Sequence, residues 1–97
     1  MTTAEMKEVL ASKLKEEGTY FTKSHISIKK AGNGIYKIVI KDYEHIPFIM
    51  SEEYDDYFGY ILYIEANDHN IAFIDSKKSF DYQTAMIRLG YYIATRF

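Results

Sequence analysis

The sequence contains no cysteine, only one proline and no apolar run long enough to span a membrane. Without cysteine there is no disulfide and no thiolate ligand for zinc, so stability has to come from packing alone. A membrane-spanning helix needs about 20 consecutive apolar residues. The N-terminal residues MTTAEMKEVL also lack the basic and then apolar pattern of a signal peptide. We therefore expect a soluble, cytoplasmic protein.

Lysine and arginine are missing from the middle of the chain, between Lys41 and Lys77. That segment instead carries nine acidic residues: Asp42, Glu44, Glu52, Glu53, Asp55, Asp56, Glu65, Asp68 and Asp75. Basic segments on both sides offset it, and the formal net charge of the whole chain is only −2. Such segregation of charge indicates either an acidic face for a basic partner or solvated loops between apolar strands.

An amphipathic helix is predicted at about 3–17. Thr2 and Glu5 have the spacing of a capping box, and Gly18 can end the helix in the left-handed conformation. Between them, apolar residues recur with helical period at Met6, Val9, Leu10 and Leu14. A chain of 97 residues, 47% of them hydrophobic, is long enough for one domain with a single core.

Two hairpins are predicted, at about 25–42 and about 58–75. In the first, apolar and polar residues alternate on both sides of Asn33-Gly34, a pair that supplies the positive φ angles of a tight turn. In the second, the turn falls at 67–70, and one strand face carries Phe58, Tyr60, Leu62, Ile64 and Ala66. Between the hairpins we expect a short strand at 46–50, followed by SEEYDD as an exposed connection.

A final helix is predicted at about 79–96, capped by Ser76 or Ser79. It is apolar on most sides, so it must be covered on most sides. Gly90 and Ala94 form a small-residue strip where the N-terminal helix or another subunit can approach closely. The whole pattern predicts an α+β domain spanning 1–97, with a single antiparallel meander sheet of four to five strands. Its N- and C-terminal helices pack on one face of the sheet.

No motif for catalysis, metal binding or cofactor binding stands out. His25, His45 and His69 fall in separate elements and lack the close spacing of a shared metal site. There is no Gly-rich phosphate loop, no G-x-S-x-G motif and no Cys/His pair. We expect a protein that is not an enzyme, with no catalytic residue, metal or cofactor.

Ten tyrosines are the second unusual feature of the composition. Some can fill the core, but three interleave with acidic residues, and tyrosine is typical of binding surfaces. The predicted partner-binding residues are Tyr43, Glu44, Glu52, Glu53, Tyr54, Asp55, Asp56 and Tyr57. We expect this surface to dock on a basic protein, because complementary charge speeds encounter and rejects wrong partners.

A basic protein surface usually serves to hold nucleic acid, so an acidic protein bound there would compete with phosphates. In type, this chain resembles the small anti-CRISPR and DNA-mimic inhibitors of mobile elements, which are short, poor in cysteine and carry an acidic patch. The resemblance implies a non-catalytic inhibitor of a nucleic-acid-binding effector, encoded by a phage or another mobile element.

Two alternatives stay open. The order helix, strands, helix, with Ser76-Lys77-Lys78 before the last helix, is similar to a double-stranded-RNA-binding domain. In that family a further lysine lies in the first helical turn and a Gly-Pro-x-His loop joins two strands, whereas here Asp81 occupies that turn and no Gly-Pro pair occurs. The resemblance implies nucleic-acid binding through a basic patch of Lys29, Lys30, Lys77 and Lys78. The other alternative is a structural role, as a homodimer formed through the C-terminal helix.

Overall fold

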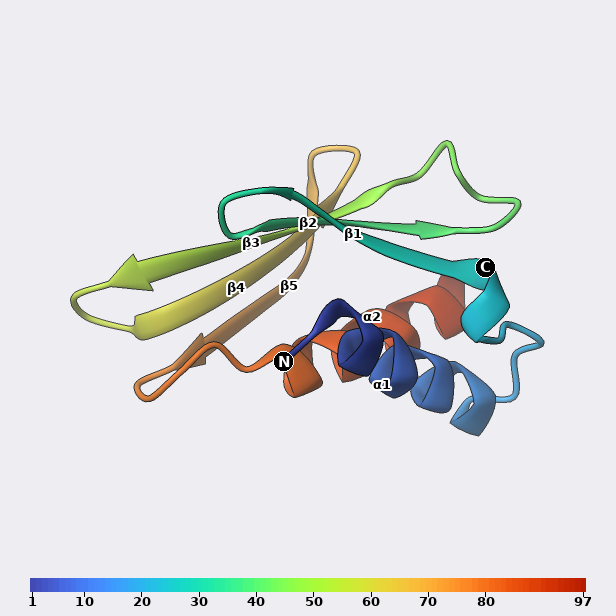
Figure 1. The fold of residues 1–97 in the computed structure, drawn as a ribbon, viewed down its shortest axis with the longest axis horizontal. Helices are drawn as coiled ribbons and strands as arrows, with labels where there is room; N and C mark the ends of the chain where they lie inside the picture. Colours follow the sequence, from blue (N-terminus) through green and yellow to red (C-terminus); the bar gives the residue numbers. More distant parts are fainter.

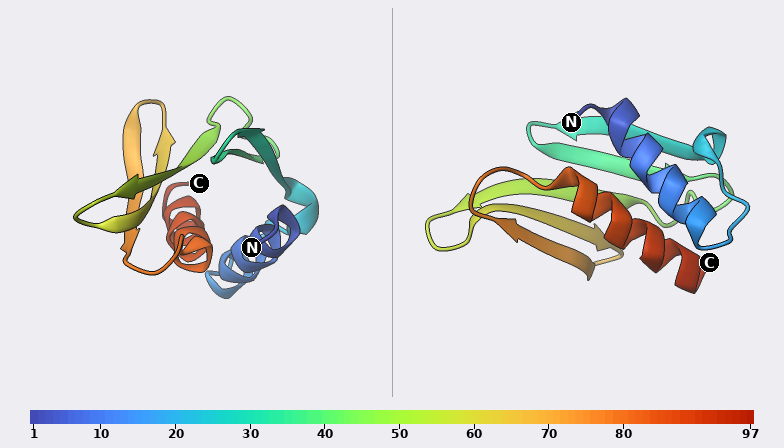
Figure 2. Two further views of the ribbon diagram at one scale, coloured as in Figure 1. Left: turned by 60° about the vertical axis from the view of Figure 1, so that its left-hand side comes forward. Right: turned by 90° about the horizontal axis from the view of Figure 1, so that it is seen from below.

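The computed structural model describes residues 1–97 and contains two α-helices and five β-strands (Figure 1). The elements are α1 (Thr3–Glu16), the 3-10 turn η1 (Lys23–His25), β1 (Ile26–Gly32), β2 (Ile35–Ile40), β3 (Phe48–Asp55), β4 (Gly59–Ala66), β5 (His69–Ser76) and α2 (Tyr82–Arg96). The strands form one antiparallel sheet in the order β1-β2-β3-β4-β5. Both helices lie on the same face of this sheet (Figure 2). The predicted α+β meander is confirmed.

Helix α1 begins as its sequence indicates. The hydroxyl oxygen of Thr2 accepts a hydrogen bond from the Glu5 amide at 3.1 Å, and the Thr2 amide donates to the Glu5 carboxylate at 2.9 Å. This reciprocal pair satisfies two amides that have no partner inside the helix. Met6, Leu10 and Leu14 are fully buried, so the apolar stripe of the helix faces the core.

Helix α2 begins at Tyr82, three residues later than expected, and neither Ser76 nor Ser79 caps it. Asp81 is the N-cap: its carboxylate accepts from the Thr84 amide at 3.1 Å and from the Thr84 hydroxyl at 2.8 Å. The sequence offers three capping residues within six positions, Ser76, Ser79 and Asp81, and Ser76 is the last residue of β5. The path of the chain from β5 to α2 decides which of them starts the helix.

The small-residue strip of α2 is occupied by α1 of the same chain. A Cβ added at Gly90 would lie 2.7 Å from Lys13 Cγ and 3.5 Å from Leu10 Cδ1. Glycine inside a helix costs about 0.5–1 kcal/mol relative to alanine, and this close helix contact compensates for it. Ile87 and Tyr91, also on α2, remain exposed.

Strand β3 differs most from the expectation. It runs through Phe48–Asp55, so most of SEEYDD belongs to a strand and not to a connection. Acidic residues are poor strand formers on their own, but pairing with β4 along the whole length, to Asp55↔Gly59, overrides that preference. Because side chains alternate along a strand, Glu52 and Tyr54 lie on the helix side and Glu53 on the opposite side.

The core fills the space between the sheet and the two helices. Its fully buried side chains include Ile38, Phe48, Met50, Leu62 and Ile64 from the sheet. The molecule is elongated, measuring 40 × 24 × 23 Å. The turn between β3 and β4 lies at one end and extends beyond the start of α2 (Figure 1). Neither helix has the length and apolar character needed to cross a membrane.

Candidate functional site

The predicted partner-binding residues fall at two opposite ends of β3. Tyr43 and Glu44 lie in the connection that leads into β3, near the C-terminus of the chain. The other six lie in residues 52–59, which we call the β3–β4 tip. Eight extended residues separate the two ends by roughly 23 Å. The acidic residues of the middle segment therefore do not form a single patch.

Tyr43 is a packing residue. Its ring stacks on Phe97 with ring centroids 4.4 Å apart, and it meets the edge of Phe21 at 6.1 Å. It is half-buried against the core. Next to it, backbone hydrogen bonds from the amides of Glu44 itself and of Asp42 lower the pKa of the Glu44 carboxyl. The ring contacts assign Tyr43 to holding the chain in place between β2 and β3, whereas Glu44 is exposed.

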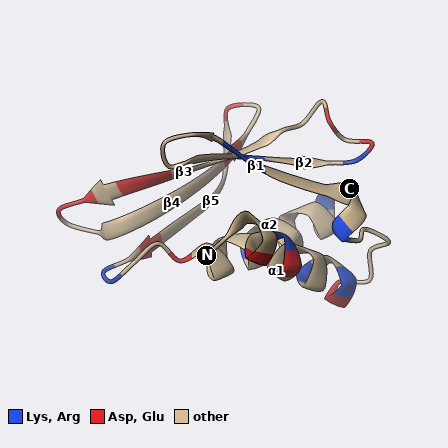
Figure 3. Cartoon of the chain, in the orientation of Figure 1, with Lys and Arg blue, Asp and Glu red and all other residues tan.

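The acidic residues of the tip form no ion pair within the chain. The chain has three ion pairs, Lys13–Glu16, Lys13–Glu17 and Lys23–Glu8, and all of them lie in or next to α1. None of the nine acidic residues between Lys41 and Lys77 takes part in one. Glu53 and Asp56 are exposed. Figure 3 shows this acidic end of β3 on the side away from the lysines of α1.

Asp55 has a structural task in the tip. One of its carboxylate oxygens accepts from the amides of Tyr57 at 2.7 Å and Phe58 at 2.9 Å. These two hydrogen bonds stabilise the charged form and lower the pKa of Asp55. The carboxylate thus holds the turn between β3 and β4.

Glu52 faces the helix side and lies over Gly34. Its amide donates to the Gly34 carbonyl at 2.8 Å, and a Cβ added at Gly34 would lie 3.2 Å from the Glu52 carboxylate. The pKa of the Tyr36 hydroxyl is raised, first by burial and then by the negative charge of Glu52. Glu52 is therefore partly occupied by contacts within the chain, whereas Glu53 and Asp56 are free to meet a partner.

Two tyrosines of the tip present most of their surface to solvent. Tyr54 is 65% exposed and Tyr57 is 81% exposed. Tyr54 rests edge-on against Tyr60, with ring centroids 5.2 Å apart, and Tyr57 rests against Phe58 at 4.9 Å. Aromatic neighbours restrict the motion of both rings without burying them. Such rings are typical of interaction surfaces, since they offer large area at low entropic cost.

Strand register adds one acidic residue that sequence reasoning did not include. Asp75 on β5 pairs with Ile61 on β4, and Ile61 pairs with Glu53 on β3. Glu53 and Asp75 therefore flank Ile61 on the same face of the sheet. No local signal marks Asp75 as a neighbour of Glu53; the alternation of both hairpins together with their register is needed to find it.

The four lysines of the alternative nucleic-acid site are split between two places. Lys77 and Lys78 directly follow β5, at the same end as the acidic tip. Lys29 and Lys30 lie on β1, at the opposite edge of the sheet. Four strand spacings amount to roughly 19 Å. The two pairs do not join into one basic patch, and acidic residues lie beside Lys77 and Lys78.

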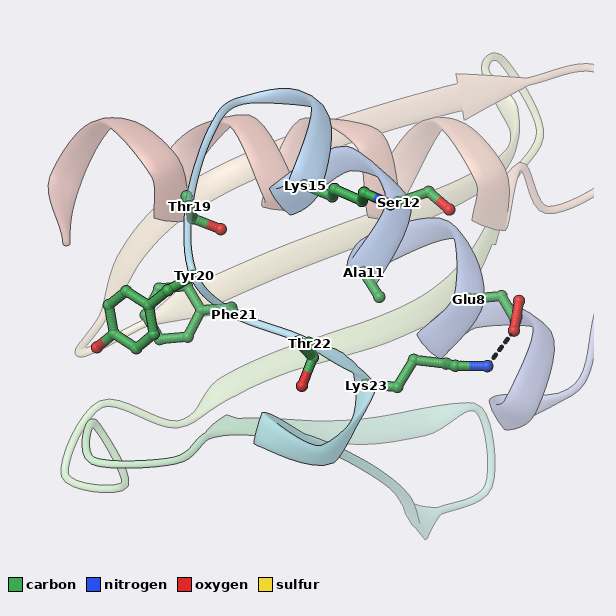
Figure 4. Close-up of a pocket in the computed structure, with 9 residues that line it drawn as sticks. All are labelled: Glu8, Ala11, Ser12, Lys15, Thr19, Tyr20, Phe21, Thr22 and Lys23. Atoms are coloured by element: carbon green, nitrogen blue, oxygen red, sulfur yellow. Dashed lines mark hydrogen bonds and ion pairs between the residues drawn. The ribbon is translucent and has the colours of Figure 1, made fainter.

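A hollow of about 390 Å³ lies between α1 and the connection to η1 (Figure 4). Its lining residues are Glu8, Ala11, Ser12, Lys15, Thr19, Tyr20, Phe21, Thr22 and Lys23. An ion pair between Lys23 and Glu8 crosses one end of it. Nearby, His25 Nδ1 accepts from the Thr22 amide at 2.9 Å, which uses this histidine to stabilise the turn. None of the predicted site residues lines the hollow.

No protein-family model, curated protein sequence or solved structure matches the chain.

Proposed function

We propose that the protein is a small interaction module whose β3–β4 tip docks on the basic surface of another protein. The observation that carries the proposal is the combination of free acidic residues with two solvent-exposed tyrosines at one projecting end. Glu53 and Asp56 are exposed and have no cation within 4.0 Å, while Tyr54 and Tyr57 are 65% and 81% exposed.

The physical reason for this proposal is the electrostatic repulsion between carboxylates that lie close together. Several carboxylates at one strand end repel each other, and none of them has a cation within 4.0 Å, although Lys77 and Lys78 lie at the same end of the sheet. Lysine and arginine side chains of a partner would offset that repulsion, and the tyrosine rings would supply apolar contact and cation–π attraction. Complementary potentials of this kind raise association rates and make them depend on salt.

The partner class that fits best is a nucleic-acid-binding effector. Its basic surface exists to bind phosphates, and a carboxylate-bearing tip would compete with them. We therefore propose an inhibitor of the anti-CRISPR or DNA-mimic type, encoded by a mobile element. A purified guide-loaded RNA-guided nuclease is the probe for this narrower proposal. The expected result is loss of its DNA binding in a gel-shift assay when the protein is added.

The docking surface itself is tested on immobilised poly-lysine, with a matched pair of variants. The tip variant carries Glu53→Gln and Asp56→Asn. The control variant carries Asp42→Asn and Asp68→Asn, two exposed residues outside the tip whose positive φ angles asparagine tolerates. Both variants lose two negative charges, so their net charge is the same.

The expected result is that the wild-type and control proteins elute at similar salt concentrations, and the tip variant elutes clearly earlier. Circular dichroism confirms that both variants stay folded. If both variants elute equally early, retention follows net charge alone and the tip has no special role. The same pair is then used with the nuclease, where only the tip variant should lose inhibition.

A further inference from the structure

The face of the sheet that lies away from the helices, which we call the outer face, is unusually apolar. An antiparallel sheet with one solvated face normally alternates apolar residues inward with polar residues outward. Here six outward positions on β2, β3, β4 and β5 are apolar: Ile35, Val39, Ile49, Ile61, Tyr63 and Phe73. We call these six residues the outer apolar strip. No helix covers them (Figure 1).

Burial confirms that the strip is separate from the main core. Ile61 is only 2% exposed, yet it is the single buried apolar side chain outside the core cluster. On the same face, Tyr63 meets Phe73 with ring centroids 5.1 Å apart. Ile35 and Phe73 remain 39% and 36% exposed. Ile35 and Phe73 lie in one row of the sheet, with Ser51 and Tyr63 between them. Exposed apolar side chains grouped on one face are a feature of interaction surfaces.

The charged residues of the outer face are basic on β1 and β2 (Lys29 and Lys37) and acidic on β3, β4 and β5 (Glu53, Glu65 and Asp75). Lys29 and Lys37 are direct neighbours in the register of β1 and β2. In the same row, Lys37 pairs with Ile49 on β3, and Ile49 pairs with Glu65 on β4. A basic side chain and an acidic side chain thus lie at equal distances on either side of the central strand, β3. A rotation of the sheet by 180° about an axis along β3 exchanges the positions of Lys37 and Glu65. Two such faces can therefore pair basic with acidic side chains.

We propose that two copies of this chain associate through their outer apolar strips, related by a two-fold axis that runs along β3. A half-turn about such an axis places β2 of one copy over β4 of the other. Lys37 then faces Glu65 of the second copy, and Ile35 faces Tyr63 of the second copy. Ile49 and Ser51, which lie on β3 itself, meet their own counterparts. Twisted sheets that pack face to face in this way cross at about 30°.

The size of the surface sets the expected strength. Five strands of about eight residues cover roughly 24 × 26 Å, or about 600 Å² on each copy. Stable interfaces bury about 800 Å² per partner, and weaker ones bury less. The association is therefore expected to be reversible and weaker than that of an obligate dimer.

The dimer involves Glu53, a residue of the acidic tip, and therefore has a consequence for the tip as a docking surface. An axis parallel to the strands keeps both β3–β4 tips at the same end of the dimer. Two acidic tips side by side would double the charge offered to a basic partner. The poly-lysine experiment needs no dimer, so it is repeated with a monomeric variant to keep the two proposals separate.

Sedimentation velocity from about 5 µM to about 500 µM tests the association directly. The wild-type protein is expected to shift from 11.4 kDa towards twice that mass as its concentration rises. A mass that stays at 11.4 kDa over the whole range overturns the proposal. Phe73→Ser removes an exposed ring from the strip and is expected to weaken association at least about tenfold. Ile87→Ser, on the exposed side of α2, is the control and should leave association unchanged.

A charge swap tests the arrangement of the two copies. Lys37→Glu and Glu65→Lys, each alone, place like charges opposite each other and should weaken association about tenfold. The double variant restores opposite charges and should recover most of the wild-type affinity. Glu53 lies on β3 and approaches its own counterpart, so Glu53→Gln should strengthen the dimer several-fold. A dimer that survives both single swaps, or that Ile87→Ser breaks, forms through another surface and refutes the proposal.

Discussion

Gly59, the first residue of β4, is the most constrained position of the acidic tip. Its φ angle is +84°, in the left-handed region that residues with a Cβ rarely adopt. A Cβ added there would lie 2.5 Å from the backbone oxygen of Ser76 and 2.9 Å from Lys77 Cα. Both atoms belong to the backbone at the end of β5, which cannot move aside as a flexible side chain can.

The expected cost of Gly59→Ala has two parts. The left-handed backbone costs a residue with a Cβ about 1 kcal/mol, and overpacking against rigid backbone costs about 1–3 kcal/mol more. The free energy of unfolding should fall by about 2–4 kcal/mol, which is a large share of the stability of a small domain. Because about 1 kcal/mol corresponds to roughly 4–8 °C in a domain of this size, the Tm should fall by at least about 8 °C.

Gly18→Ala is the matched control for this prediction. Gly18 has a nearly equal φ of +82°, but a Cβ there would have nothing within 4 Å. The Gly18→Ala variant should lose only the free energy that the left-handed backbone costs, about 1 kcal/mol of the free energy of unfolding. Urea unfolding followed by circular dichroism measures both variants. If they lose the same free energy, the close approach between Gly59 and the end of β5 does not exist, and the placement of the tip against β5 is wrong.

Three further predictions concern the elements that hold the tip and the helices. Asp81→Ala should lower the free energy of unfolding by about 1 kcal/mol, while Ser79→Ala should have almost no effect; urea unfolding decides which residue is the cap. Leu62→Ala should cost about 2–5 kcal/mol, because this fully buried side chain leaves a cavity; a loss below about 1 kcal/mol would contradict its burial. Folding lowers the pKa of Asp55 from its ordinary value of 3.8, so its charge stabilises the fold above pH 3.8, and this contribution is lost as the pH falls through the folded value. Asp55→Asn should therefore destabilise the protein at pH 7, and the difference from the wild type should shrink in unfolding experiments below pH 3.8; a constant difference would mean that the charge of Asp55 plays no part.

Much of the fold was predictable because its signals are local. The cap of α1 needs only Thr2 and Glu5, which are three residues apart, and the first hairpin needs only the alternation around Asn33-Gly34. The spacing of apolar residues in a helix or a strand repeats within a few residues. An apolar stripe can therefore be recognised without knowing which elements it packs against. From these elements the antiparallel sheet with helices on one face follows by topology.

The acidic site was predictable only in part. Tip residues such as Glu53 and Tyr57 are exposed, as their composition indicates. Tyr43 appeared equivalent to them, because it too lies among acidic residues. Its actual neighbour is Phe97, more than fifty positions away along the chain. A pattern confined to one segment carries no information about such a contact.

The amino-acid sequence alone determined the elements of this protein, since capping, turn chemistry and periodicity act between residues close together in the chain. Only the tertiary structure decided the full length of β3, the separation of the acidic residues into two ends, and the apolar outer face. Those features arise from strand pairing over long sequence distances, such as Glu53 with Ile61 and Ile61 with Asp75. A shift of one residue in either pairing would move every side chain of the strand to the other face.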